Sequence, residues 1–219
     1  DSTRYEHFTM MDNDYRRLNI QIWYPANIPN IDTNPVMYLN HPKKQIPAIA
    51  KQLEIPSYLL TNIKNIKTNA YLNAPIVSDQ GVFPILLFSH GLGGMKNQNS
   101  IQIEALVQTG YIVIAPDHSY DANITVFNDG SIADFRSGSE GINTEKQFWA
   151  YRLPQLQKRT DDINYIYNKI RLLTKYRKSI WTYIDIDKVG IFGHSFGGAT
   201  SIMVAHSNPD IDAVFLLDA

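Results

Sequence analysis

The chain has 219 residues, of which 44% are hydrophobic and 19% are charged. This length and balance are typical of a globular domain and exclude an intrinsically disordered protein. The formal net charge of −1 gives no positive field to attract nucleic acid, so we expect no nucleic-acid partner. The absence of cysteine excludes disulfides, thiolate metal sites and cysteine catalysis.

The N-terminal part of the sequence predicts a strand and two short helices. Residues 17–24 alternate apolar and polar side chains, which indicates a half-exposed strand. The Pro- and Asn-rich residues 25–45 indicate a loop. Apolar side chains then recur at helical spacing on both sides of Pro56, so we expect two amphipathic helices within residues 46–66.

The rest of the chain alternates predicted buried strands with helices. Short continuous apolar runs indicate strands covered on both faces, and a period of 3.6 residues indicates the helices. A polar loop is expected over residues 119–145. The expected apolar stripe of the long helix consists of Leu153, Leu156, Thr160, Ile163, Tyr167 and Ile170. The predicted elements are a strand at 83–89, a helix at 100–108, a strand at 111–115, a helix at 146–178, a strand at 188–192, a helix from 198 and a buried strand at 213–217.

This alternation predicts an α/β fold with a mostly parallel sheet and helices on both faces. No repeat or low-complexity tract divides residues 1–219, so we expect a single domain. Because a domain rarely ends on a core strand, we expect this domain to be C-terminally incomplete. The start at Asp1 fits either a removed leader or a trimmed chain. We expect a secreted or periplasmic location, and the absence of cysteine fits a cytoplasmic one as well.

The segment Gly193-His194-Ser195-Phe196-Gly197 follows a predicted buried strand and opens a helix rich in small residues. This is the context of the nucleophile elbow in an α/β-hydrolase fold, where a strained turn exposes a serine hydroxyl above a helix N-terminus. Side chains on either side of the serine would collide, so positions 193 and 197 need glycine. The pattern predicts Ser195 as the nucleophile of an acyl transfer, and an ordinary strand–helix turn is the alternative.

A second glycine-rich segment, His-Gly-Leu-Gly-Gly at residues 90–94, ends an earlier predicted strand. Acyl transfer needs two backbone N–H groups directed at the carbonyl oxygen as it becomes negative. In this fold one amide comes from the residue after the nucleophile, here Phe196, and the other from a loop of this type, here Leu92. Gly91 and Gly93 let the loop approach the substrate. Leu92 and Phe196 are therefore the predicted oxyanion hole.

The acid of a catalytic triad follows the nucleophile in this fold, which leaves three carboxylates to consider. Asp218 ends an apolar strand, where it can orient an imidazole from the same sheet edge, and is the predicted acid. Asp210 and Asp212 lie in a loop before that strand, where we expect solvation. Asp117, at another strand end, is the alternative acid, and loop hydrogen bonding would be its structural role.

The general base is missing from its expected place, because no histidine follows Asp218 in this sequence. His206 lies on the helix after the elbow and points away, and His194 is expected to pack under the turn. His90 is expected to brace the oxyanion loop by hydrogen bonds, and His118 could line the pocket. We assign the base to a missing C-terminal segment, on this chain or on another polypeptide.

Three segments resemble the signatures of the platelet-activating-factor acetylhydrolase family, which includes the lipoprotein-associated phospholipase A2. They are residues 88–94, residues 193–200 and residues 217–219, and residues 20–25 also resemble the first strand of bacterial relatives. The resemblance implies that Ser195 is the nucleophile and that Asp218, 23 residues later, is the acid. It also implies that Leu92 and Phe196 supply the oxyanion-hole amides. The family's histidine has no counterpart in this sequence.

The resemblance implies calcium-independent hydrolysis of esters with short or oxidised acyl chains, typically at the sn-2 position of phospholipids. An acyl-serine mechanism of this kind requires no metal or organic cofactor. The helices within residues 46–66 would lie near the pocket mouth, where they touch a lipid surface or only cover the core. Three alternatives stay open: a carboxylesterase, polyester hydrolase or triacylglycerol lipase with the same site; a non-catalytic binding module on the same fold; and one half of a clipped enzyme.

Overall fold

The computed structural model describes residues 3–9, 14–28, 34–138, 141–176 and 178–218. A five-stranded sheet in the order β1-β3-β2-β6-β7 forms its centre, and β4 and β5 form a separate hairpin. The strands are β1 (Asn19–Trp23), β2 (Phe83–Ser89), β3 (Ile112–Asp117), β4 (Ile124–Val126), β5 (Ile132–Asp134), β6 (Ile184–His194) and β7 (Ala213–Leu217). The α-helices are α1 (Pro42–Gln52), α2 (Ser100–Gln108), α3 (Glu145–Thr174) and α4 (Phe196–Ser207), and the 3₁₀ helices are η1 (Ser57–Asn65) and η2 (Ser179–Tyr183).

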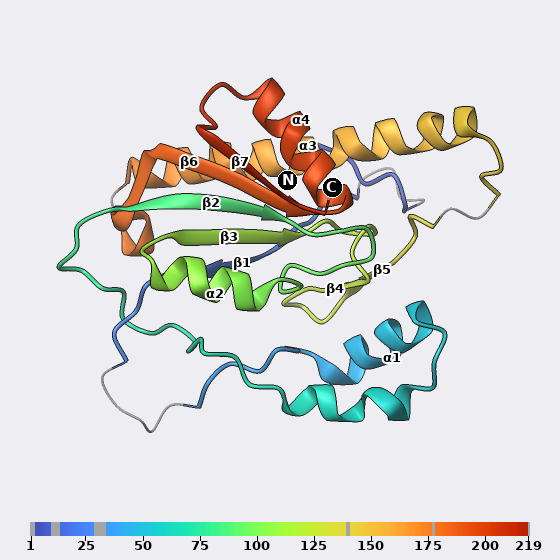
Figure 1. Cartoon of the computed structure of the whole chain (residues 1–219), viewed down its shortest axis with the longest axis horizontal. Coiled ribbons are helices and arrows are strands. Elements are labelled where there is room, and N and C mark those ends of the chain that lie inside the picture. The colour runs from blue at the N-terminus through green and yellow to red at the C-terminus, as the bar shows by residue number, and fades with distance from the viewer. Residues whose placement is uncertain (1–2, 10–13, 29–33, 139–140, 177, 219) are drawn as a thin grey trace.

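The central sheet is mostly parallel, as the alternation of strands and helices predicts. β2 pairs in parallel with both β3 and β6, β6 pairs in parallel with β7, and β1 alone runs antiparallel, along β3. The carboxyl ends of the parallel strands therefore meet at one edge of the sheet (Figure 1). In open α/β sheets this edge is where ligands bind.

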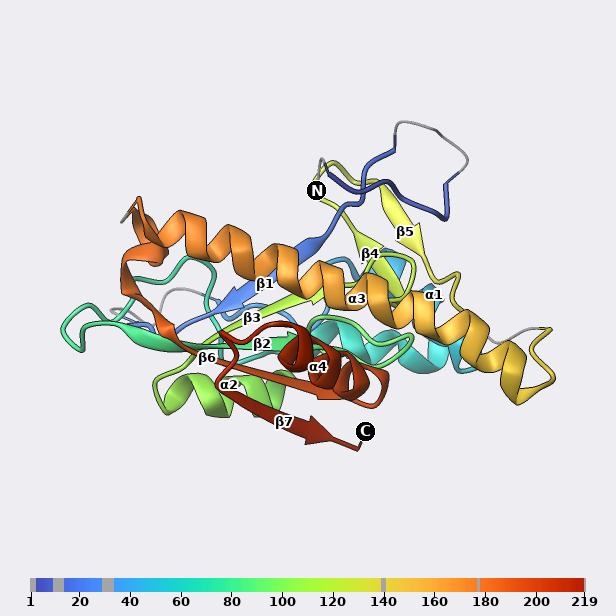
Figure 2. The same cartoon turned by 90° about the horizontal axis from the view of Figure 1, so that it is seen from above.

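Both faces of the sheet are covered by helices, and each face has its own apolar core. On one face, Ile85 and Leu87 of β2 pack with Ile163 and Ile166 of α3. On the other face, Phe88 packs with the buried side chains of α2 and β1. Figures 1 and 2 show α3 and α4 on the first face and α2 on the second, with α1 and η1 forming a further layer on the side of α2. The two-sided sheet confirms the predicted fold class.

Two predictions about residues 119–170 are wrong. Residues 119–145 are not simply a polar loop, because they contain the β4–β5 hairpin and a buried stretch at residues 121–127. The expected apolar stripe of α3 also fails in its N-terminal half, where Leu153 is 54% exposed and Arg152 and Arg159 are buried. This half of α3 lies over the polar strand ends and not over the apolar sheet, so its inward face carries hydrogen-bonding groups.

The predicted strand at the end of the chain is present as β7, but it is not buried. β7 is an edge strand, and Phe215 on it is 63% exposed. Among the described residues no further strand or helix covers its outer side. No helix in the described part of the chain combines the length and apolarity that crossing a membrane would need.

Candidate active site

The parallel strands bring the predicted site segments to one edge of the sheet. β2 and β7 lie on either side of β6. Ser89, at the end of β2, pairs in register with Gly193 of β6. On the other side, Leu217 of β7 pairs with His194. The residues that follow β2 and β7 therefore flank Ser195 from both sides.

Ser195 lies in a sharp turn between β6 and α4. Its φ of 51° falls in the left-handed region, which non-glycine residues rarely adopt, and the residue is exposed. A Cβ atom at Gly193 would clash with the carbonyl oxygen of Gly197, and one at Gly197 would clash with that of Ser89. This close approach explains why both positions hold glycine. The turn presents the serine at the N-terminus of α4, whose partial positive charge favours a developing anion.

The loop of residues 90–94, here called the oxyanion loop, has one backbone amide left free between residues 91 and 94. The other three donate hydrogen bonds of 2.9–3.0 Å, Gly91 to Gln98 Oε1, Gly93 to the Asp121 carbonyl and Gly94 to the Gly91 carbonyl. Within the described chain the amide of Leu92 has no acceptor. The amide of Phe196 also has no acceptor among the described residues, because the first residue of α4 has no intrahelical acceptor. The two free amides are the pair that the sequence predicts for the oxyanion hole.

A buried arginine on α3 holds the oxyanion loop in place. Arg159 has no exposed surface, and its Nη1 donates to the His90 carbonyl at 2.7 Å. Its Nη2 donates to the Gly91 carbonyl at 3.4 Å, and its Nε donates to Asp121 Oδ2 at 2.8 Å. The guanidinium also lies 5.0 Å from the centroid of the Phe196 ring. One side chain thus contacts both segments that carry the free amides.

His90 braces the oxyanion loop from inside, as expected. The His118 amide donates to Nε2 of His90 at 3.0 Å, so the ring proton lies on Nδ1, which donates to the Gly91 carbonyl at 2.6 Å. Burial, followed by the charge of Arg159, holds the pKa of His90 well below its ordinary value. His90 is therefore a neutral imidazole with a fixed tautomer.

The expectation that His118 lines the pocket is wrong, because its side chain is fully buried. Its Nε2 lies 3.0 Å from Ser89 Oγ, and its Nδ1 lies 2.9 Å from Asp162 Oδ2. Arg16 binds the same carboxylate through two nitrogens, at 3.0 and 2.7 Å. This chain of contacts has the connectivity of a catalytic triad, but Ser89, His118 and Asp162 have no exposed surface. These contacts tie the ends of β2 and β3 to α3, and the buried side chains offer no surface to a substrate.

The predicted acid lies on the other side of the elbow. The Ser195 amide donates to the Leu217 carbonyl at 2.9 Å, which ties the end of β7 to the turn. The next residue, Asp218, is exposed and has a φ of 50°. Its carboxylate has no hydrogen-bond or ion-pair partner among the described residues. It is therefore available to a group that approaches from outside the described chain.

The other acids considered from the sequence have structural partners. Asp117 accepts hydrogen bonds from the amide of Lys96 at 2.7 Å and from its Nζ at 2.8 Å. Asp212 accepts the amide of Val189 at 2.8 Å. Asp210 is exposed and pairs with side chains of α3. Asp117 is thus occupied in loop hydrogen bonding, the structural role weighed for it above.

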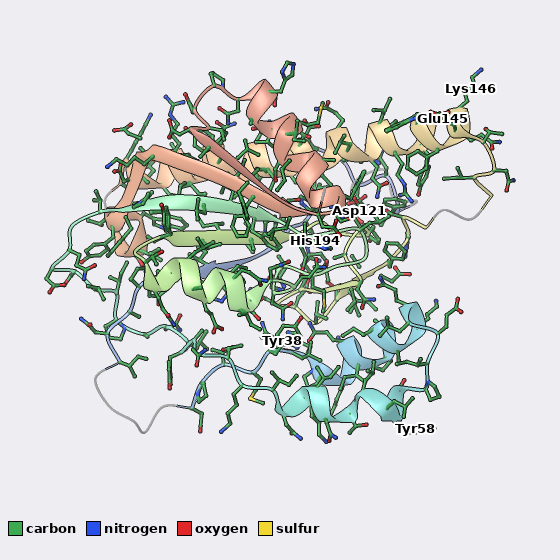
Figure 3. The ribbon with its side chains drawn as sticks, in the orientation of Figure 1. Tyr38, Tyr58, Asp121, Glu145, Lys146 and His194 are labelled. Atoms are coloured by element: carbon green, nitrogen blue, oxygen red, sulfur yellow. The ribbon has the colours of Figure 1, made fainter. Side chains whose placement is uncertain are left out.

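No histidine side chain in the described part of the chain is hydrogen-bonded to Ser195 or Asp218. The nearest in sequence, His194, places its Nδ1 3.3 Å from Gln98 Nε2, beside the oxyanion loop. Figure 3 shows His194 at the carboxyl edge of the sheet. His206 is exposed on α4.

Sequence reasoning missed the buried polar residues of α3 that support the site. A signal was available, because Arg152, Gln155, Arg159 and Asp162 recur at helical spacing. Periodic polar residues usually indicate a solvated helix face. Here they indicate a buried face opposite polar loops, which the spacing of apolar residues alone does not reveal.

The parallel sheet, the strand–serine–helix turn and the glycine-rich loop beside it define an α/β-hydrolase fold. The family model described as "Platelet-activating factor acetylhydrolase, isoform II" matches residues 7–219. The chain therefore belongs to the platelet-activating factor acetylhydrolase isoform II family.

Individual relatives are distant and longer than this chain. The platelet-activating factor acetylhydrolase of the dog is 25% identical, over 96% of this chain and 51% of its own length. The bovine protein of the same name is 26% identical, over 63% of this chain and 35% of its own. A ferulic acid esterase from Streptomyces cinnamoneus shares the fold, with a TM-score of 0.73 and 20% identity over 97% of this chain and 54% of that one. The chain thus spans about half the length of the first of these relatives.

Proposed function

We propose that this chain carries the nucleophile, the oxyanion hole and the acid of a serine esterase. The observation that carries the proposal is the placement of the exposed Ser195 between two kinds of free group. On the side of β2 lies the amide of Leu92, with that of Phe196 in the turn itself, and on the side of β7 lies the unpartnered carboxylate of Asp218.

In the proposed reaction, a general base removes the proton from Ser195 Oγ as this oxygen attacks the ester carbonyl carbon. The amides of Leu92 and Phe196 donate hydrogen bonds to the oxyanion of the tetrahedral intermediate. The protonated base returns its proton to the departing alcohol, which leaves an acyl-serine. Water, activated by the same base, then releases the acid and restores Ser195. Asp218 orients the base and stabilises its cationic form.

The base in this proposal is a histidine from polypeptide that packs against β7. The open edge of β7 and the exposed Phe215 offer a surface for a further strand or helix. Asp218 lies at the end of this surface, next to the elbow. A histidine carried there would meet both the carboxylate and Ser195 Oγ.

The proposed substrates are carboxylic esters with short or oxidised acyl chains, including phospholipids acylated at sn-2. Membership of the platelet-activating factor acetylhydrolase family supports this choice. The same residues would serve a general carboxylesterase, a polyester hydrolase or a triacylglycerol lipase. Rates on different substrates are therefore needed to distinguish these activities.

The test compares kcat/KM of the full-length protein for short-chain sn-2 phospholipids, nitrophenyl esters, triacylglycerols and polyester films. We expect turnover of the phospholipids and of short nitrophenyl esters, and a loss of about 10⁶ in kcat in Ser195→Ala. The matched control is Ser207→Ala, at the opposite end of α4, which should keep full activity. Ester turnover that survives in Ser195→Ala would overturn the proposed nucleophile.

A further inference from the structure

The half-buried side chain of Gln98 lies between the oxyanion loop and the end of β6. Its carbonyl oxygen accepts the amide of Gly91 at 3.0 Å, and its amide nitrogen lies 3.3 Å from Nδ1 of His194. Leu92 follows Gly91 directly, and its amide is one of the two free amides. Phe196, which carries the other, lies two residues after His194. Gln98 therefore bridges the two segments that form the predicted oxyanion hole.

The glycines of the oxyanion loop make room for this bridge. A Cβ atom added at Gly94 would clash with Oε1 of Gln98. One added at Gly91 would lie 2.8 Å from Nδ1 of His194. A side chain at either position would thus displace the Gln98 amide or the His194 ring from its contact. The loop is closed around the two groups that connect it to β6.

The Gly91 amide fixes the orientation of the Gln98 side chain. A backbone N–H only donates, so the end of Gln98 that faces it is the carbonyl oxygen. The amide nitrogen of Gln98 also only donates, and it faces Nδ1 of His194. Nδ1 is therefore the acceptor in this contact, and the proton of the His194 ring lies on Nε2.

The position of Gly91 sets the direction of the free amide of Leu92. The Gly91 carbonyl accepts Nδ1 of His90 at 2.6 Å and the amide of Gly94 at 3.0 Å. In a trans peptide the carbonyl and the following N–H point in opposite directions, so the Leu92 N–H points away from these donors. Gln98 holds the other polar group of Gly91, its own N–H. The residue that orients the Leu92 amide is therefore held on both sides.

We propose that Gln98 is a positioning residue of the oxyanion hole. By holding Gly91 and His194 together, it sets the separation of the two free amides. These donors have to match the oxyanion of the tetrahedral intermediate, which lies in a different place from the ground-state carbonyl oxygen. Loss of the bridge should therefore weaken the binding of the transition state more than that of the substrate. The inference rests on the proposed function, because the oxyanion forms only in that reaction.

The first test is Gln98→Met in the full-length protein, which keeps a similar side-chain size and removes both contacts. We expect kcat for a short nitrophenyl ester to fall about 10-fold, with KM changed by less than about 2-fold. This loss is smaller than the factor of about 10²–10³ for a missing donor, because a displaced amide still contributes in part. Titration with a fluorophosphonate counts the active sites and corrects kcat for any misfolded protein. The matched control is Gln102→Met, at an exposed position on α2, which should keep the original kcat.

A transition-state analogue distinguishes positioning from a purely structural role. A trifluoromethyl ketone takes up Ser195 Oγ at its carbonyl carbon, and the resulting oxyanion occupies the oxyanion hole. The corresponding secondary alcohol forms no such adduct. We expect Gln98→Met to raise the inhibition constant of the ketone about 10-fold and to leave that of the alcohol unchanged. Equal changes for both ligands, or no change for the ketone, would exclude the positioning role.

A second variant tests whether the two ends of the bridge act together. His194→Phe keeps a ring of similar size and removes the acceptor of Gln98. If both residues act through one contact, Gln98→Met/His194→Phe should lose no more kcat than the more impaired single variant. Losses that multiply, to about 100-fold in the double variant, would show that Gln98 and His194 act independently and would contradict the bridge.

Failure of this inference and failure of the esterase proposal give different results. Ester turnover that is lost in Ser195→Ala and unchanged in Gln98→Met would overturn the positioning role alone. Turnover that survives in Ser195→Ala would overturn both.

The contact itself can be measured without turnover, by NMR of the full-length protein at about pH 8. The nitrogen signals of the His194 ring are those that disappear in His194→Phe. We expect the chemical shifts of an unprotonated Nδ1 and a protonated Nε2, and a loss of this preference in Gln98→Met. A protonated Nδ1 in the unmodified protein would contradict the contact.

Discussion

The two sides of the Ser195 turn are built in opposite ways. On the side of β2, the oxyanion loop rests on the buried side chains of Arg159 and His90. On the side of β7, Asp218 and the strand before it are mostly exposed. On the first side, the described residues supply the hydrogen bonds that hold the loop. On the second side, the Asp218 carboxylate and the edge of β7 have no partner among the described residues. Substitutions on the two sides should therefore differ in what they damage.

The largest difference is expected at Asp218. Asp218→Asn should lower kcat of the full-length protein by about 10⁴, because the base loses its orienting charge. The free energy of unfolding of the 219-residue chain should change by less than about 0.5 kcal/mol, because the carboxylate is exposed and unpaired here. Steady-state kinetics and urea denaturation measure the two effects. The control is Asp187→Asn, at an exposed acid on β6, which should change neither kcat nor the free energy of unfolding. An unchanged kcat in Asp218→Asn would show that Asp218 is not the acid.

At Arg159, in contrast to Asp218, we expect a large loss of stability. Arg159→Met removes the ion-pair partner of a buried carboxylate, Asp121, together with the donors to the oxyanion loop. Breaking such a buried pair costs about 3–5 kcal/mol, so the loss should appear in the denaturation midpoint. Arg171→Met breaks an exposed pair with Asp210 and should cost less than about 1 kcal/mol. Equal costs for the two variants would contradict the buried support of the loop.

The turn at Ser195 should be sensitive to substitution of its glycines. Gly193→Ala places a methyl group against the backbone of Gly197, and overpacking of this kind costs about 1–3 kcal/mol or more. Gly138→Ala is the matched control, because a Cβ atom there meets no atom within 4 Å. Thermal denaturation should separate the two variants clearly. A Gly193→Ala protein as stable and as active as Gly138→Ala would mean that the turn is not as tight as described.

The smallest expected effect is a pH dependence of stability. Burial is the main cause that lowers the pKa of both His90 and His118 in the folded protein. Below about pH 6.5 the unfolded chain then binds protons that the folded chain does not, so the free energy of unfolding decreases as the pH falls. The slope should reach at most about 1.4 kcal/mol per pH unit for each histidine.

Urea denaturation between about pH 7.5 and pH 5 measures this slope. His118→Gln should flatten it, whatever its effect on stability at neutral pH, whereas the exposed His206→Gln should leave it unchanged. A slope that is the same in His118→Gln and in the unmodified chain would show that this imidazole titrates alike in both states.

The parts of the site that follow from local geometry could be predicted from the sequence. The collisions at Gly193 and Gly197 are set by the turn, and the parallel strands place residues 90–94 and Asp218 beside it. The support of the oxyanion loop could not be predicted in this way. Arg159 and Asp121 are 38 residues apart, and nothing in either local pattern indicates that they meet.

The β4–β5 hairpin and the exposure of β7 escaped prediction for related reasons. Polar residues at 121–127 read as a solvated loop unless their long-range partners, on α3 and in the oxyanion loop, are known. An apolar run such as residues 213–217 reads as buried whichever polypeptide covers it. An apolar pattern predicts that a segment tends to be buried. Only the structure shows which element packs against it.

Labelling of the folded full-length protein with a serine-directed fluorophosphonate, followed by peptide mass mapping, tests the proposed nucleophile most directly. We expect one adduct, on Ser195, that disappears in Ser195→Ala and persists in Ser207→Ala. A folded protein that takes no label, or that takes it on a different serine, would contradict the proposal.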